Sequence, residues 1–379
     1  MTARLPSLIA LFIGIIVIFF LAKKLSNIYG GLLSAFLYAF SHLNLAYATQ
    51  AKPYAAIETI TLFVLLLIVY AKKEKRKLRL YFYHIFIISL LSIATLLHSL
   101  GVLLWILYGI YIFLNLKNFK LKKFQAVFII IGIIIIGYNF ILPIVLSSIG
   151  GGRLLLFNHL YQSVKLFTYK YTFVSVCAFF GYIWLFKKHK TISIAVLFYS
   201  TVVFFMATFR VYIFNIRYVL SLFGILFLYF GIFWAKMGER YLPKRKWLIP
   251  IAVMILLYAT GYKIVRFPQV YYNPNIDKYG DVQIANYKDF YAQLKKRFPN
   301  YKKLYVINDT FDVEYWYFGR YSNAYFMKFT AYGSLENFEK IIKDHPQGLL
   351  IVEDWESFLP EDIKQYAKKN LKFEFRIIS

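Results

Sequence analysis

Long apolar runs separated by short basic clusters constrain the fold of this chain more than any other feature of its sequence. A helix that crosses a bilayer needs about 20 mostly apolar residues. Ten runs of about that length occur, at residues 5–22, 30–48, 54–71, 82–98, 100–116, 125–147, 172–186, 192–209, 213–235 and 248–264. The sequence therefore predicts an α-helical polytopic membrane protein with about ten transmembrane helices.

The composition excludes the common soluble classes. Of the 379 residues, 60% are hydrophobic and 17% are charged, whereas soluble domains are about 45–50% apolar and about 25% charged. This excludes an ordinary cytosolic protein, a disordered chain and a coiled coil. The single cysteine, Cys177, lies inside an apolar run, so we interpret it as a buried apolar side chain, with no intrachain disulfide and no cysteine-based zinc site.

The net charge of +27 is concentrated in the apolar part of the chain. Residues 1–264 hold 28 Lys and Arg side chains and three acids, whereas residues 265–379 hold 17 basic and 15 acidic side chains. Basic side chains clustered between apolar runs set the orientation of a membrane protein. We therefore expect membrane lipids as partners, and no nucleic acid.

Twenty of those 28 basic residues lie in five loops that follow every second run. The positive-inside rule places these loops in the cytoplasm, and it therefore places Met1 and the tail after residue 265 outside the cell membrane. A first helix that runs from outside to inside is unusual. The sequence thus predicts that an upstream segment with an odd number of helices is missing.

The tail, residues 266–379, has a different pattern. Short apolar strands are expected at 304–307, 324–327, 348–352 and 371–378, and helices at 281–298, 310–321, 334–345 and 359–370. Strands that alternate with helices predict a small α/β domain with a mainly parallel sheet. We therefore divide the chain into a polytopic domain, residues 1–265, and an extracytoplasmic domain, residues 266–379.

Polar and cationic side chains at the predicted outer ends of the helices are candidates for a binding site, because such groups are costly in a bilayer. The candidate substrate-binding residues are Gln50, Lys52, Tyr54, His98, Arg153, Arg210, Arg217 and Tyr218. Together they predict an aromatic, cationic cavity that opens outward. Arg and Lys side chains there could hold the phosphate of a lipid carrier.

Each candidate also has a purely structural interpretation. Lys52 and Arg210 could extend along the helix ends to the interface, as basic side chains commonly do, and His98 could hydrogen-bond a neighbouring helix. Arg217 is expected about two turns inside a spanning run, where a charge is harder to explain without function. Glu58 is a weak candidate for the catalytic base, and it could instead be a carboxyl that stabilises helix packing.

The sequence lacks the common signatures of metal and cofactor sites. It has no paired His and Asp spacing for a metal, no nucleophile elbow, no phosphate loop and no dinucleotide-binding glycine pattern. We therefore predict neither a metal nor a cofactor.

Three short segments resemble motifs of one family. These are Arg4-Leu-Pro-Ser7 at the start of the first run, Tyr47-x-x-Gln50-x-Lys52-Pro53-Tyr54 in an outer turn, and Arg217-Tyr218 in a late run. In their order they resemble segments of the GT-C membrane glycosyltransferases, the dolichyl-phosphate-mannose-protein mannosyltransferase-like enzymes, with Lys52 where Arg is usual. The resemblance covers roughly residues 1–265.

The resemblance implies transfer of a sugar from a polyprenyl-phosphate donor to a glycan, lipid or protein acceptor on the extracytoplasmic face. The family's catalytic acid lies in an external loop that precedes the Arg-Leu-Pro-Ser segment, and this sequence has no counterpart to it. The expectation is therefore either an N-terminally truncated glycosyltransferase or a protein that has lost catalysis. Two other classes stay open: a transporter or flippase for lipid-linked glycans, and a non-catalytic assembly protein.

Overall fold

A computed structural model of the chain describes residues 4–49, 52–115, 167, 171–209, 216–259, 287–300, 304–308, 334–351, 360–372 and 374. The chain divides into two compact units, Met1–Val270 and Tyr271–Ser379. The predicted run at 125–147 lies outside the described residues.

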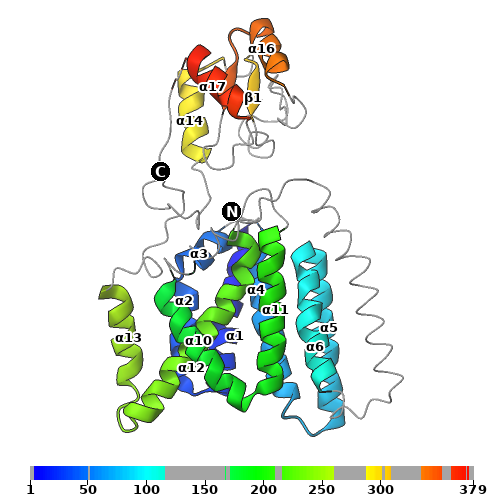
Figure 1. Cartoon of the computed structure of the whole chain (residues 1–379), viewed down its shortest axis with the longest axis vertical. Helices are drawn as coiled ribbons and strands as arrows, with labels where there is room; N and C mark the ends of the chain where they lie inside the picture. Colours follow the sequence, from blue (N-terminus) through cyan, green and yellow to red (C-terminus); the bar gives the residue numbers. More distant parts are fainter. Residues whose placement is uncertain are drawn as a thin grey trace. The chain divides into compact units, whose positions relative to one another are not determined.

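The first unit is helical throughout its described part (Figure 1). Its α-helices are α1 (Leu5–Leu25), α2 (Ile28–Phe40), α3 (His42–Ala48), α4 (Tyr54–Ala71), α5 (Lys77–Leu97), α6 (Leu103–Leu114), α10 (Thr172–Lys188), α11 (Lys190–Phe209), α12 (Leu220–Tyr241) and α13 (Leu248–Ala259). Two 3₁₀ turns, η2 (Ser99–Val102) and η5 (Ile216–Val219), precede α6 and α12. The fold class predicted from the apolar runs, a helical one, is thus observed.

Four helices of the described part, α1, α4, α5 and α12, are long and apolar enough to cross a membrane. Shorter apolar helices occupy Ile28–Phe40, Leu100–Leu114, Lys190–Met206 and Leu248–Leu257. Large apolar side chains remain exposed along α1 and α5, among them Phe12 at 65% and Leu96 at 87%. Exposed apolar faces of this extent are unfavourable in water and suit contact with lipid, which supports a membrane protein.

The predicted run at 30–48 is not one helix. It breaks at Ser41, whose backbone is extended and whose side chain accepts a hydrogen bond from the backbone N–H of Asn44 at 3.4 Å. Serine competes in this way for backbone groups and favours the start of a helix over its interior. The prediction of one continuous helix there was wrong, because apolar content alone does not register such a cap.

Helix α12 lies at the centre of the described bundle and packs against α10, α2, α4 and α1. Glycines bring these helices close together. A Cβ atom on Gly181 of α10 would lie 2.0 Å from the carbonyl oxygen of Tyr229, and one on Gly231 would lie 2.5 Å from that of Gly30 in α2. Because lipid chains are as apolar as the helices, close backbone packing of this kind is a main source of helix association in membranes.

His189 joins α10 to α11 and is buried, with 7% of its surface exposed. Its burial and the positive charges of Lys72, Lys188 and Lys73 lower the pKa of the imidazole to about 4. The folded protein therefore holds His189 neutral at pH 7.

The second unit contains α14 (Tyr287–Arg297), β1 (Val306–Asn308), α16 (Leu335–Asp344), β2 (Leu349–Ile351) and α17 (Glu361–Asn370). The two strands pair in parallel, with Val306 opposite Leu349. Apolar side chains on α16 and α17 pack with Ile307 of β1. Strand β1 begins two residues later than predicted, and the side chain of Ser334 caps α16 as expected from the sequence. The elements expected at 310–321, 324–327 and 371–378 fall largely or wholly outside the described residues.

The close approach of α10 and α12 gives a first prediction. Gly181→Val should lower the free energy of unfolding by about 1–3 kcal/mol, because its side chain needs space that the Tyr229 carbonyl occupies. The thermal midpoint in detergent micelles measures this. Val176→Ile, at an exposed position of the same helix, is the control and should change the midpoint little. Equal midpoints for the two variants would contradict the packing described.

The depressed pKa of His189 gives a second prediction. His189 binds a proton near pH 6.5 in the unfolded chain, but only near pH 4 in the folded chain. The free energy of unfolding is therefore highest above pH 6.5 and decreases as the pH falls from 6.5 toward 4. The thermal midpoint should therefore fall between pH 7 and pH 5. In His189→Gln the fall should be smaller, and an identical fall would show that other groups cause it.

Candidate functional site

The first two resembling segments meet at one end of the bundle. Pro53 precedes the first turn of α4, where its fixed backbone angle suits a helix start. The hydroxyl of Ser7, at the beginning of α1, donates a hydrogen bond to the backbone carbonyl of Lys52 at 3.0 Å. This bond joins residues 45 positions apart, so the Arg-Leu-Pro-Ser and Lys-Pro-Tyr segments form one local structure.

Tyr54 stands at the centre of four aromatic rings from different segments. The centre of its ring lies 6.0 Å from that of Tyr47, 5.2 Å from that of His98 and 6.4 Å from that of Tyr218. The pairs with Tyr47 and Tyr218 are edge-to-face, an arrangement that is favourable beyond the apolar area it buries. We call these four residues the Tyr54 cluster, and it contains three of the predicted site residues.

The hairpin between α5 and α6 presents His98 to this cluster. His98 has an extended backbone and its Nδ1 atom accepts a hydrogen bond from the backbone N–H of Leu100 at 3.1 Å. The turn is tight, since a Cβ atom on Gly101 would lie 2.0 Å from the carbonyl oxygen of Ala94. His98 therefore has a structural role in the turn as well as a ring that contacts Tyr54.

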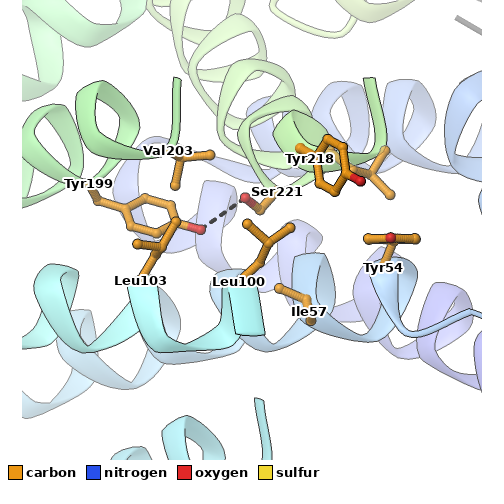
Figure 2. A pocket seen from close by; sticks show the side chains of 9 residues that line it. Tyr54, Ile57, Leu100, Leu103, Tyr199, Val203, Tyr218 and Ser221 are labelled. Atoms are coloured by element: carbon orange, nitrogen blue, oxygen red, sulfur yellow. Dashed lines mark hydrogen bonds between the residues drawn. The ribbon is translucent and has the colours of Figure 1, made fainter. Parts of the chain in front are cut away.

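Tyr54 and Tyr218 also line a cavity between α4, η2, α6, α11 and the start of α12 (Figure 2). Its walls are mainly apolar, with Ile57, Leu100 and Leu103 among them. The cavity is narrow, with a volume of about 10 Å³, which is room for about one water molecule. In the described part of the chain it can therefore admit one group of about the size of a hydroxyl.

Two polar residues of the cavity, Tyr199 and Ser221, were not predicted. The hydroxyl of Tyr199 donates a hydrogen bond to Oγ of Ser221 at 2.9 Å, and Figure 2 shows this bond beside the apolar wall. Both lie within apolar runs, where one hydroxyl is common and gives no pattern. Only the packing of α11 against the start of α12 identifies them.

Glu58 is buried in α4 and does not line the cavity. Only 1% of its surface is exposed. Tyr38, Asn44 and the backbone of Gly224 supply hydrogen-bonding groups to its carboxyl, although its Oε1 atom lacks a hydrogen-bond partner within the described structure. A base must reach the proton it removes, so this position favours the packing role over the catalytic one.

A chain of hydroxyl contacts surrounds the same carboxyl. The hydroxyl of Thr59 donates to the carbonyl oxygen of Ala10 at 2.7 Å and lies 3.3 Å from that of Tyr38. These contacts connect the buried faces of α1, α2 and α4. The polar groups near Glu58 therefore hold the helices in register.

The predicted cations are described only in part. Lys52 is exposed at the turn before α4. Arg217 was predicted to lie two turns inside a helix. It lies instead in the 3₁₀ turn η5 before α12, next to Tyr218. The prediction misjudged where the helix starts. Gln50, Arg153 and Arg210 lie outside the described residues.

Of the nine predicted residues, the structure thus brings Lys52, Tyr54, His98 and Tyr218 to one end of the bundle. Within the described residues it shows no group of three or more His, Cys, Asp or Glu side chains that could hold a metal ion. Neither the models of known protein families nor the curated proteins match this sequence.

The Tyr54 cluster gives a third prediction. Tyr54→Ala should cost about 3–5 kcal/mol of the free energy of unfolding, because a buried ring and its ring contacts are lost. Unfolding in a denaturing detergent, followed by circular dichroism, measures the loss. Tyr81→Ala removes a ring that is 64% exposed on α5 and should cost much less. Similar losses for both variants would contradict the central place of Tyr54.

Proposed function

We propose that this chain takes part in sugar transfer from a polyprenyl-phosphate-linked donor to an acceptor at the extracytoplasmic face of the cell membrane. The observation that carries the proposal is the meeting of the three resembling segments. Ser7 is bonded to Lys52, and Tyr54 contacts Tyr218, which adjoins Arg217. Segments that are remote in sequence but adjacent in space are what a shared site requires.

The proposal includes a topology. Ten membrane spans with the basic loops in the cytoplasm would put the Tyr54 cluster at the outer surface, because α4 begins at Tyr54 and ends at Ala71, just before the basic stretch that starts at Lys72. The second unit would then be extracytoplasmic too. A lipid-linked phosphate at this surface can keep its hydrocarbon chain in the bilayer.

The residues near the cluster suit such a donor. Apolar and aromatic walls with a few placed polar groups are typical of ligand sites, and the cavity has room for a single hydroxyl group of such a donor. Lys52 and Arg217 would attract the phosphate, and they would stabilise the charge that develops on it as the bond to the sugar breaks. In the reaction, a base takes the proton of the acceptor hydroxyl, the hydroxyl oxygen bonds to the anomeric carbon, and polyprenyl phosphate leaves.

A second candidate is binding of the lipid-linked glycan without chemistry, as in a flippase or an assembly protein. One observation favours it: among the described residues, no carboxyl group lines the cavity, and Glu58 is buried in α4. A site with cations and rings but no base can hold the donor without transferring its sugar.

A transfer assay in membranes tests the proposal. Membranes that contain the chain are incubated with radiolabelled polyprenyl-phosphate sugars, and both donor binding and labelled product are measured. Arg217→Gln should lower kcat/KM for the donor by roughly 10²–10³-fold, the usual cost of losing one group that stabilises transition-state charge. Arg79→Gln, in the first turn of α5 at the basic end, is the matched control and should leave transfer unchanged.

The outcomes separate the two candidates. Donor binding without product, weakened in Arg217→Gln, supports the binding role. If the chain neither binds any polyprenyl-phosphate sugar nor transfers its sugar, both candidate functions are refuted.

A further inference from the structure

A second cavity lies at the other end of α12, among the ends of α1, α10 and α12. Its volume is about 360 Å³, and it is open to the surroundings. This volume lies within the range of ligand sites. None of the residues assigned above to the candidate site lines it.

The lining of this second cavity has two chemical parts. Trp184, Leu185 and Ile232 form an apolar wall, and Lys188 and Arg240 lie in the last turns of α10 and α12. Lys188 and Arg240 are both exposed. An apolar wall beside cations matches an amphipathic anion, in which a hydrocarbon portion adjoins a charged group.

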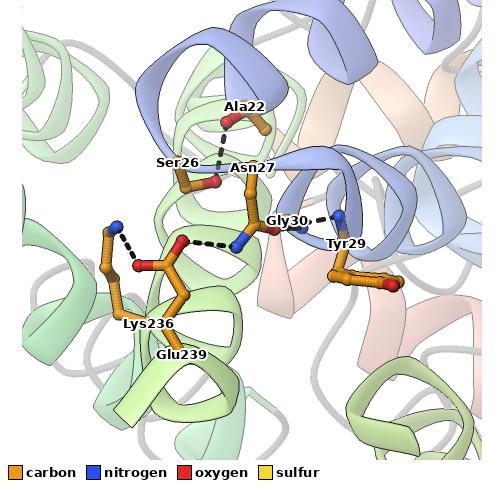
Figure 3. Close-up of polar contacts among 7 residues, drawn as sticks. All are labelled: Ala22, Ser26, Asn27, Tyr29, Gly30, Lys236 and Glu239. Atoms are coloured by element: carbon orange, nitrogen blue, oxygen red, sulfur yellow. Dashed lines mark hydrogen bonds and ion pairs between the residues drawn. The ribbon is translucent and has the colours of Figure 1, made fainter. Parts of the chain in front are cut away.

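An ion pair at the edge of this cavity neutralises its acid. Glu239 is the one acid among the described residues that line it, and its carboxylate accepts hydrogen bonds from Nζ of Lys236 and from Nδ2 of Asn27, the latter at 2.7 Å (Figure 3). The lining therefore holds three cations and one acid, a net charge of +2. The two cations outside the Lys236–Glu239 pair, Lys188 and Arg240, carry this excess.

Asn27 does not line the cavity, but it holds the carboxylate of Glu239, which does. Its Oδ1 atom accepts hydrogen bonds from the backbone N–H groups of Tyr29 and Gly30, which caps α2, while its Nδ2 atom donates to Glu239 of α12. Figure 3 shows the one side chain joining the two helices. The carboxylate of Glu239 is therefore engaged by Asn27 and Lys236. Lys188 and Arg240 can contact an anion from outside the chain.

Cations at the C-terminal ends of helices also complement the helix dipole, so charge alone does not define a site here. The cavity provides the independent observation, since complementing a dipole does not require an open space of this size. In the topology proposed above, the basic clusters face the cytoplasm, which would put the cavity at the level of the lipid headgroups of that leaflet.

We propose that this cavity binds the phosphate headgroup of an anionic phospholipid, with Lys188 and Arg240 contacting the phosphate and an acyl chain lying against Trp184. The proposal requires that the chain is in a membrane, but it does not depend on sugar transfer. Anionic lipid bound here would join the ends of α10 and α12 and stabilise the bundle.

Lipid binding to the purified whole chain tests this proposal. The delipidated protein in detergent is titrated with phosphatidylglycerol, with phosphatidylcholine and with soluble glycerol phosphate, and bound lipid is counted by native mass spectrometry. Phosphatidylglycerol should bind at least about tenfold more tightly than either of the others. Equal affinity for phosphatidylcholine, or equal affinity for glycerol phosphate, would overturn the assignment to an anionic lipid.

Matched variants locate the site. Lys188→Gln with Arg240→Gln should weaken phosphatidylglycerol binding by about tenfold. Lys187→Gln with Lys244→Gln removes the same charge from neighbouring positions that do not line the cavity and should weaken it much less. Equal weakening in both double variants would show binding by diffuse charge and would refute the site.

Fluorescence gives a readout of lipid position that does not depend on affinity. Phosphatidylglycerol with brominated acyl chains should quench the emission of Trp184, measured as the difference between the protein and its Trp184→Phe variant. In the Lys188→Gln, Arg240→Gln protein, brominated phosphatidylglycerol should no longer quench Trp184, and the circular dichroism spectrum should be unchanged. Quenching of Trp184 that is the same with brominated phosphatidylcholine would contradict the proposal.

Discussion

The close packing of α12 against its neighbours is the contact on which the rest of the described bundle depends. In a bilayer, helices gain little from burying apolar surface against each other, so they associate through backbones that approach closely. Gly231 of α12 allows this close approach to α2, and Gly181 of α10 allows the close approach of α10 to α12. A side chain at Gly181 would separate α10 from α12, the two helices that provide most of the lining of the second cavity.

One helix thus positions two chemically different sites. At the start of α12, Tyr218 and Ser221 meet Tyr54 in a narrow aromatic cavity. At its end, Arg240 and the Lys236–Glu239 pair border a larger basic cavity. The proposed partners of both sites are lipids that carry phosphate. The two sites differ in that the first has hydroxyl groups beside its aromatic rings, which suits the sugar of the proposed donor.

The sequence predicted the helical class because the apolar runs leave no other structure that satisfies the backbone in lipid. It did not predict the break at Ser41, since a capping serine and a buried serine look alike in an apolar run. It predicted Tyr54, His98 and Tyr218 as site residues, and the structure places the rings of His98 and Tyr218 beside that of Tyr54. Tyr199 and Ser221 became visible only through the packing of two helices. Arg217 was misplaced because α12 starts at Leu220, three residues after Arg217, and not at the predicted residue 213.

The proposed topology is tested most directly by measuring on which side of the membrane two residues lie. Cys177 is buried and is the single cysteine of the chain, so a Cys177→Ala background allows one new cysteine at a time. Lys75→Cys and Lys368→Cys are both at exposed positions. With a membrane-impermeant maleimide on intact cells, the account predicts labelling at 368 and none at 75 until the cells are opened. Labelling of both positions from the same side would contradict it.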